Sequence, residues 1–131
     1  MDRPFRSDCP IASALDIVGD RWSLLVIRNL MLGARSFRQM QAAPERIATN
    51  ILSDRLKRLV EAGLAVEQRA IAGSGSRGGY VLTPAGADLL PVLQEIAKWG
   101  VAHLTDRRPI PEAFLATTPA LLLNSADKPL S

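Results

Sequence analysis

The stretch "ATNILSDRLKRLVEAGL", residues 48–64, has two chemically different faces when it is drawn as a helix. At about 100° per residue, Leu52, Leu56 and Leu59 fall together and form a stripe that a protein core can bury. The opposite side is polar, and its members are Asn50, Asp54, Lys57 and Glu61, flanked by Ser53 and Arg58. A helix that reads DNA in the major groove needs this division, because one face is anchored while the other reaches bases and phosphates. A helix that only braces a small domain shows the same division, so the neighbouring elements are needed to choose between the two.

The elements predicted around this helix follow the order of a winged helix-turn-helix. A short helix is predicted over residues 36–43, opened by Ser36 and stopped by Pro44, and the quoted helix comes next. Two strands follow at 64–71 and 79–83, joined by the Gly/Ser-rich tip "AGSGSRG". In that arrangement the second helix enters the major groove, the first braces it, and the hairpin forms a wing. A hairpin that serves only solubility is the alternative for the two strands.

Helices are also predicted on both sides of this unit. Upstream, residues 10–18 and the segment "RWSLLVIRNLML" after Asp20 each carry an apolar face. Downstream, one helix is predicted over residues 84–104, capped by Thr83 and kinked at Pro91. Its apolar side chains cover about 200° of the helix, whereas an ordinary surface helix needs little more than about 100°. Because a chain of 131 residues has little surface to cover the surplus, the pattern predicts a second copy of the chain as partner.

The charge distribution is consistent with a nucleic-acid partner. The net charge is only +3, but residues 35–77 contain eight basic and four acidic side chains. The positive excess therefore lies in the middle third of the chain, as expected when one face meets a polyanion. A solvated surface with unevenly spaced charges is the alternative.

The composition argues against several other classes of protein. No apolar run approaches the roughly 20 residues that span a bilayer, and the polar start "MDRPFRSDCP" is unlike a signal peptide. One cysteine and one histidine are too few for a zinc site, and no catalytic set of side chains or phosphate-binding loop is visible. We therefore expect a cytoplasmic, nucleoid-associated protein that is not an enzyme, does not enter a membrane and needs neither metal nor cofactor.

Three segments, in order, resemble the HxlR family of bacterial winged-helix transcriptional regulators. They are "CPIASALDIVGDRWSLLVIRNLMLGARSFRQM", "ILSDRLKRLVEAGLAVEQ" and "YVLTPAGADLLPVLQEIAKWG". The resemblance implies a mostly α fold with a small β-hairpin wing, which dimerises through its N-terminal and C-terminal helices and binds operator DNA. We accordingly expect an N-terminal arm at 1–8, a DNA-binding and dimerisation domain at 9–104, and a Pro-containing tail at 105–131. The tail is longer than expected for the family and the resemblance implies no role for it; we expect it to be partly ordered, with at most one short helix.

The chain departs from the family pattern in two places. The family usually has a serine that caps the recognition helix, where this chain has Ala48, so Thr49 is the candidate cap. The family's wing usually carries prolines and an acid before its tyrosine, whereas this chain reads "GSGSRGGY". Because of the second departure, we expect this wing to be more mobile than the wing of the family.

The candidate DNA contacts combine the polar face of the quoted helix with basic residues around it. Asparagine can pair with adenine, and arginine or lysine can contact guanine or phosphate. Arg55 lies near the core edge of the helix, so a structural salt bridge is its alternative role. The full set is Arg38, Thr49, Asn50, Ser53, Asp54, Arg55, Lys57, Arg58 and Arg77. The expected dimer interface comprises Ile11, Leu15, Leu93, Ile96, Trp99 and Gly100.

Cys9 is the one candidate for a redox switch. It begins the first predicted helix, where the helix dipole favours a thiolate, and Arg6 is close in sequence, but Asp8 beside it has the opposite effect. Some regulators of the HxlR type sense oxidants through a cysteine at this place. The alternative is a small interface residue that never reacts.

The sequence as a whole predicts a sequence-specific DNA-binding transcriptional regulator. It would act as a homodimer on a pseudo-palindromic operator, with Cys9 oxidation or an unidentified small-molecule effector as candidate modulators. The alternative is a winged-helix protein-interaction module without specific DNA binding.

Overall fold

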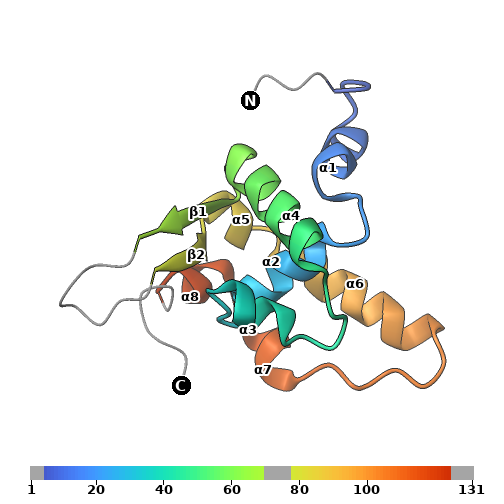
Figure 1. Cartoon of the computed structure of the whole chain (residues 1–131). Coiled ribbons are helices and arrows are strands. Elements are labelled where there is room, and N and C mark those ends of the chain that lie inside the picture. Colours follow the sequence, from blue (N-terminus) through green and yellow to red (C-terminus); the bar gives the residue numbers. More distant parts are fainter. Residues whose placement is uncertain (1–4, 70–77, 125–131) are drawn as a thin grey trace.

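The computed structural model describes residues 5–69 and 78–124, and within these ranges the chain is mostly helical with one β-hairpin (Figure 1). The elements are α1 (Pro10–Val18), α2 (Ser23–Met31), α3 (Phe37–Gln41), α4 (Thr49–Glu61), β1 (Ala65–Gln68), β2 (Gly79–Leu82), α5 (Pro84–Ala87), α6 (Leu90–His103), α7 (Glu112–Ala116) and α8 (Pro119–Asn124). This confirms the predicted fold class. None of the helices in the described ranges is long and apolar enough to cross a membrane.

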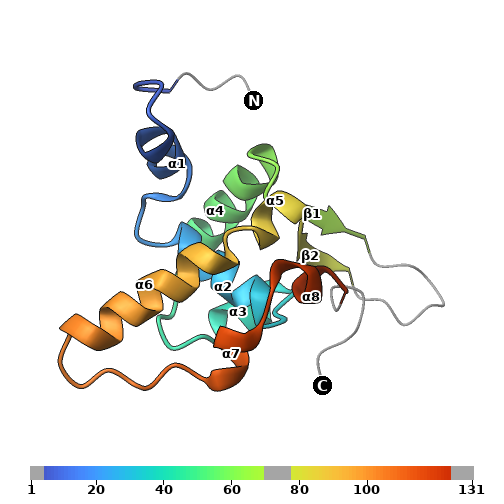
Figure 2. The ribbon, with the colours of Figure 1, turned by 180° about the vertical axis from the view of Figure 1, so that it is seen from behind.

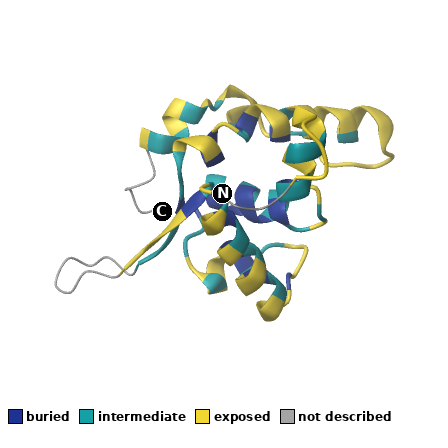
Figure 3. Ribbon diagram, turned by 90° about the horizontal axis from the view of Figure 1, so that it is seen from above, coloured by how far each residue is buried: buried dark blue, intermediate teal, exposed yellow. Residues whose placement is uncertain are grey.

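Helix α2 lies in the middle of the molecule, with α3 and α4 on one side and α6 on the other (Figures 1 and 2). The buried residues concentrate in this middle layer, as the view from above shows (Figure 3). The leucine stripe of α4 is fully covered, since Leu52, Leu56 and Leu59 are at most 1% exposed. Val60, which follows Leu59 on the same helix, is 37% exposed and lies outside the core. Each buried leucine contributes about 1.5–3 kcal/mol of transfer free energy, so the stripe anchors α4 firmly.

Local capping signals were predicted correctly on both sides of α4. Ser36 and Gln39 form a reciprocal capping box at the start of α3. The Thr83 hydroxyl accepts a hydrogen bond from the backbone N–H of Gly86 and donates one to the carbonyl oxygen of Gly63. Thr83 therefore caps α5 and ties it to the end of α4.

The hairpin pairs β1 with β2 in antiparallel register, from Ala65 opposite Leu82 to Gln68 opposite Gly79. It is anchored to the segment before α3, because the backbone N–H of Tyr80 donates to the carbonyl oxygen of Arg35 at 2.9 Å. Glycine is required at position 79, where φ is +126° and a Cβ atom would lie 2.5 Å from the Arg35 carbonyl oxygen.

The single helix predicted over 84–104 is wrong in one respect, because the structure has two helices there. Helix α5 ends at Ala87, and α6 begins at Leu90 after a turn. The cause is Pro91, which has no N–H to donate to the carbonyl oxygen of Ala87 and occupies the first turn of α6 instead. The predicted kink is therefore a break.

The tail is more structured than predicted, since it forms two short helices, α7 and α8, that pack back on the domain (Figure 2). The side-chain amide of Gln94 donates to the carbonyl oxygens of Phe114 and Thr117, at 3.0 and 3.1 Å. Phe114 packs against the core, and α8 contacts α5. These contacts hold residues up to 124 against the domain, while the boundary at residue 104 stays a prediction.

Candidate nucleic-acid interface

Helix α4 lies near α3 and the hairpin (Figure 1), and most of its polar residues are exposed to solvent. Most of the candidate contacts on it are exposed, namely Thr49, Asn50, Ser53, Asp54 and Lys57. Because the leucines of the same helix are buried, the exposed side chains are held on a rigid support. The structure thus brings these candidates together along one helical face.

Thr49 does not cap α4, and the alternative cap suggested by the sequence is wrong. The helix begins at Thr49 with Ala48 as its N-cap residue, and no side chain accepts a hydrogen bond there. Thr49 Oγ1 instead accepts a hydrogen bond from Nε2 of Gln41 at 2.8 Å. Its hydroxyl therefore links the end of α3 to the start of α4.

Arg55 is held in a salt-bridge network, which is the structural role considered as its alternative. Its Nε donates to Asp20 Oδ1 at 2.9 Å, and Nη1 donates to Asp54 Oδ2 at 2.5 Å. Arg58 approaches the same Asp54 carboxylate at 3.7 Å. Asp54 is therefore occupied by neighbouring arginines, and its negative charge is offset where a phosphate would approach.

Asp20 joins this network to the start of α2. Its carboxylate accepts hydrogen bonds from the backbone N–H groups of Trp22 and Ser23, from the Ser23 hydroxyl and from Arg55. Burial raises the pKa of Asp20, but the hydrogen bonds from Ser23, Trp22 and Arg55 outweigh it and hold the pKa well below its usual range. Asp20 therefore holds the turn that leads into α2, whose N-cap residue is Trp22, and it also orients α4 through Arg55.

Replacing Asp20 with alanine is expected to lower the free energy of unfolding at pH 7 by about 2–3 kcal/mol, because a cap and a partly buried ion pair are lost together. A carboxyl whose pKa is lowered on folding stabilises the fold above its unfolded pKa of about 3.9, and this contribution disappears as the pH falls through the folded value. Urea denaturation should therefore show a large difference from the wild type at pH 7 that shrinks below about pH 4. The exposed Asp8→Ala variant is the control, and equal stability of Asp20→Ala and wild type at pH 7 would contradict the role of the network.

The basic candidates differ in how far they are available. Arg38 on α3 and Lys57 on α4 are exposed, and neither has an acidic partner among the residues that the structure describes. Arg58 is half-buried beside Asp54. Arg77 lies outside the described residues, so its contact from the wing stays a prediction.

Sequence reasoning missed the ion pair that fixes the turn between α3 and α4. Arg28 donates to both carboxylate oxygens of Glu45, at 2.6 and 3.0 Å, and to the side-chain oxygen of Asn29. The hydrogen bonds from Arg28 lower the pKa of Glu45. The partners are 17 residues apart, so no local spacing indicates the contact.

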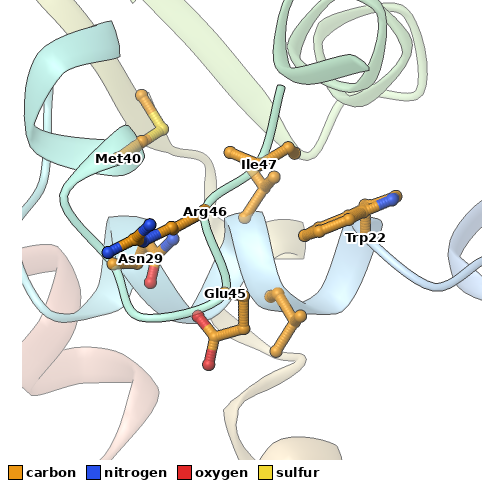
Figure 4. Close-up of a pocket in the computed structure, with 9 residues that line it drawn as sticks. Trp22, Asn29, Met40, Glu45, Arg46 and Ile47 are labelled. Atoms are coloured by element: carbon orange, nitrogen blue, oxygen red, sulfur yellow. The ribbon is translucent and has the colours of Figure 1, made fainter. Parts of the chain in front are cut away.

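A small cavity beneath this turn, lined by Trp22, Met40 and Ile47 among others, has a volume of about 10 Å³ and holds no more than a water molecule (Figure 4).

Helices α1 and α6 each expose apolar side chains to solvent. Ile11 and Leu15 on α1, and Ile96 and Trp99 on α6, are each at least half exposed. Gly100 is half-buried beside them. The prediction that Leu93 belongs to the dimer interface is wrong, since its side chain is 9% exposed and lies in the core of its own chain.

Cys9 is exposed at the N-cap position of α1. Arg6, the cationic neighbour considered in the sequence, is directed elsewhere, because its guanidinium donates to the Asp16 carboxylate at 2.5 Å. The role of Cys9 as a switch stays a prediction.

A buried leucine stripe beneath a polar second helix, braced by α3 and followed by an anchored hairpin, defines the chain as a winged helix-turn-helix transcriptional regulator. More specifically, it belongs to the HxlR-like helix-turn-helix family, whose sequence model matches residues 17–108. Among the residues that the structure describes, no three His, Cys, Asp or Glu side chains lie close enough together to hold a metal ion.

Relatives and solved structures agree with this assignment. The chain is 37% identical over 92 residues to the uncharacterized helix-turn-helix-type transcriptional regulator YvaP of Bacillus subtilis, which covers 70% of this chain and 84% of YvaP. It spans only 58% of the length of matching mycobacterial regulators. The structure of PA1607, a candidate transcription factor, superposes with a TM-score of 0.69 at 37% identity, covering 80% of this chain and 73% of PA1607. The reduced form of the transcriptional regulator YodB from B. subtilis superposes with a TM-score of 0.62 at 28% identity, covering 78% of this chain and all of that one.

Proposed function

We propose that the protein is a sequence-specific DNA-binding regulator that acts as a homodimer on a pseudo-palindromic operator. The observation that carries the proposal is the division of α4, whose leucine stripe is buried while Asn50, Ser53 and Lys57 face solvent. In this mode α4 enters the major groove, and the exposed Arg38 of α3 meets the flanking phosphates. The DNA in question is that of the nucleoid, in the cytoplasm.

The apolar surface of α1 and α6 supports the homodimer. Trp99 on α6 is 60% exposed and Ile11 on α1 is 72% exposed, and side chains of this size are costly to leave in water. A two-fold contact through this surface gives each dimer two copies of α4. The two half-sites would then lie about one helical turn of DNA apart, or a multiple of it.

The direct test is fluorescence anisotropy with DNA from upstream of the protein's own gene, against a scrambled duplex and over a salt series. Tight binding to the first duplex, with a steep salt dependence, is the result expected for a regulator. Weak and equal binding to both duplexes, or no binding at low salt, would instead favour a protein-interaction module.

Two substitutions separate base reading from phosphate contact. Asn50→Ala is expected to reduce the preference for the correct base at one operator position by about tenfold, because a bidentate contact to adenine is lost. Arg38→Gln is expected to weaken binding to all duplexes alike and to reduce the salt slope by about one. Anisotropy on the operator and on single-base variants measures both effects.

Lys98→Gln is the matched control, since it removes one positive charge from α6, away from α4. It should leave both the base preference and the salt slope unchanged. An equal loss for Asn50→Ala and Arg38→Gln on operator and random DNA would contradict this division of roles.

A further inference from the structure

A large groove lies between the domain and the tail. Its walls are α2, α6, the turn after α3, and the segment from Asp106 to Leu122, and its volume is about 1130 Å³. Figure 2 shows the backbone leaving the end of α6 in a long loop and returning through α7. The volume slightly exceeds the usual range for small-molecule sites in proteins, roughly 300–1,000 Å³.

The lining of the groove is mainly apolar. Leu32, the C-cap residue of α2, is 62% exposed and Val101 on α6 is 43% exposed, so their side chains are only partly covered by the chain itself. The other apolar lining residues include Leu25, Leu90, Ala97, Ile110 and Phe114. An apolar concave surface of this extent favours a ligand with a hydrophobic body.

The groove also carries an excess of positive charge. Arg28, Arg107 and Arg108 line it, and Asp106 is the one acidic side chain among its lining residues. Arg28 is paired with Glu45, which also feels the charge of Arg108. Even with Glu45 included, one arginine charge remains unbalanced. A planar guanidinium is well suited to a carboxylate, so the excess favours a ligand with one acidic group.

We propose that this groove binds a small amphipathic carboxylate, with its apolar body against α2 and α6 and its acidic group near Arg108, and that the bound ligand changes the affinity for operator DNA. The regulatory half of this inference rests on the proposed DNA binding, whereas the binding half does not. The link to DNA is physical, because the groove is also lined by Gln39 and Ala42, which belong to α3 and its C-cap, and α3 braces α4. Much of one wall comes from residues after 108, where the family match ends.

The binding test uses 2-naphthoate and decanoate, each compared with its uncharged amide, in calorimetric titrations of the full chain. The carboxylates are expected to bind at least about tenfold more tightly than the amides, which corresponds to one charge-assisted hydrogen bond. Arg108→Gln should make the affinities for each carboxylate and its amide nearly equal. Ala97→Phe, which fills the groove, should abolish binding of both kinds of ligand. Lys98→Gln is the control, because Lys98 lies on α6 but does not line the groove. This variant should change carboxylate affinity by less than about twofold.

Absence of binding by both carboxylates, or carboxylate affinity that Arg108→Gln and Ala97→Phe leave unchanged, would overturn the site. If Ala97→Phe does not fold, the exposed Arg108→Gln variant still decides the outcome. The second arm measures operator affinity with and without saturating carboxylate, and a change of at least about threefold is expected, as for a coupling free energy of modest size. Binding without any change in operator affinity would overturn the regulatory half. Carboxylate binding by a protein that binds no DNA would count against the proposed function and leave the site standing.

Discussion

Replacing Trp99 with glutamate is expected to convert the protein to a monomer and to weaken operator binding by at least about 100-fold. Trp99 is 60% exposed, so the substitution removes little from the fold of one chain. In the proposed dimer, however, it places a charge in an apolar interface, and burying an unpaired charge costs several kcal/mol. Two linked copies of α4 gain about 10²–10⁴ in affinity over one copy, and this gain is lost when the dimer dissociates. Sedimentation analysis and anisotropy measure the two effects on the same samples.

Lys98→Glu is the control for this experiment, because it also introduces an acid on α6 but on its polar side, where Lys98 pairs with Glu95. It should leave the oligomeric state unchanged. A dimeric Trp99→Glu variant with normal operator binding would show that the apolar surface of α1 and α6 serves another purpose.

Gly86→Ala is expected to lower the free energy of unfolding by more than about 3 kcal/mol. A Cβ atom at this position would lie 2.0 Å from the carbonyl oxygen of Leu64 and 3.0 Å from Cδ2 of Leu82. The Leu64 oxygen already accepts a hydrogen bond from the N–H of Thr83, so neither the strand nor α5 can move without losing that contact. Thermal and urea unfolding measure the loss, and the hairpin should separate from α5 in the variant.

Gly100→Ala is the matched control when both variants are measured in the monomeric Trp99→Glu background, because within one chain a Cβ atom at Gly100 has no neighbour within 4 Å. Since Gly100 lies inside α6, alanine there should be neutral or stabilise the chain by up to about 1 kcal/mol. Similar stability of Gly86→Ala and wild type would mean that α5 and β1 can separate at little cost.

Local signals account for most of the fold that could be predicted. The N-cap at Ser36, the cap at Thr83 and the leucine spacing of α4 each act over a few residues, so each is readable from the sequence. The break near Pro91 was predicted only as a kink, because a proline shows where a helix is disturbed but not whether the two halves separate.

The features that escaped prediction depend on contacts between distant segments. The tail folds back through hydrogen bonds from Gln94 to carbonyl groups about 20 residues away, and no pattern within the tail itself indicates them. The same holds for the candidate site. The polar face of α4 was predictable from the helical spacing of its residues. The pairing of Arg55 with Asp20, 35 residues earlier, could be found only from the structure.

Asp20 lies two residues after the end of α1 and is bonded to α4 through Arg55, so a very short link joins the proposed dimer arm to the proposed reading helix. Because this connection is short and fixed at both ends, a rotation of α1 would also rotate α4. In the proposed homodimer, the relative orientation of the two copies of α4 around the DNA would then depend on how α1 packs against the partner. The protein should accordingly tolerate little variation in operator spacing, and inserting half a helical turn of DNA between the half-sites would point the second helix away from its groove.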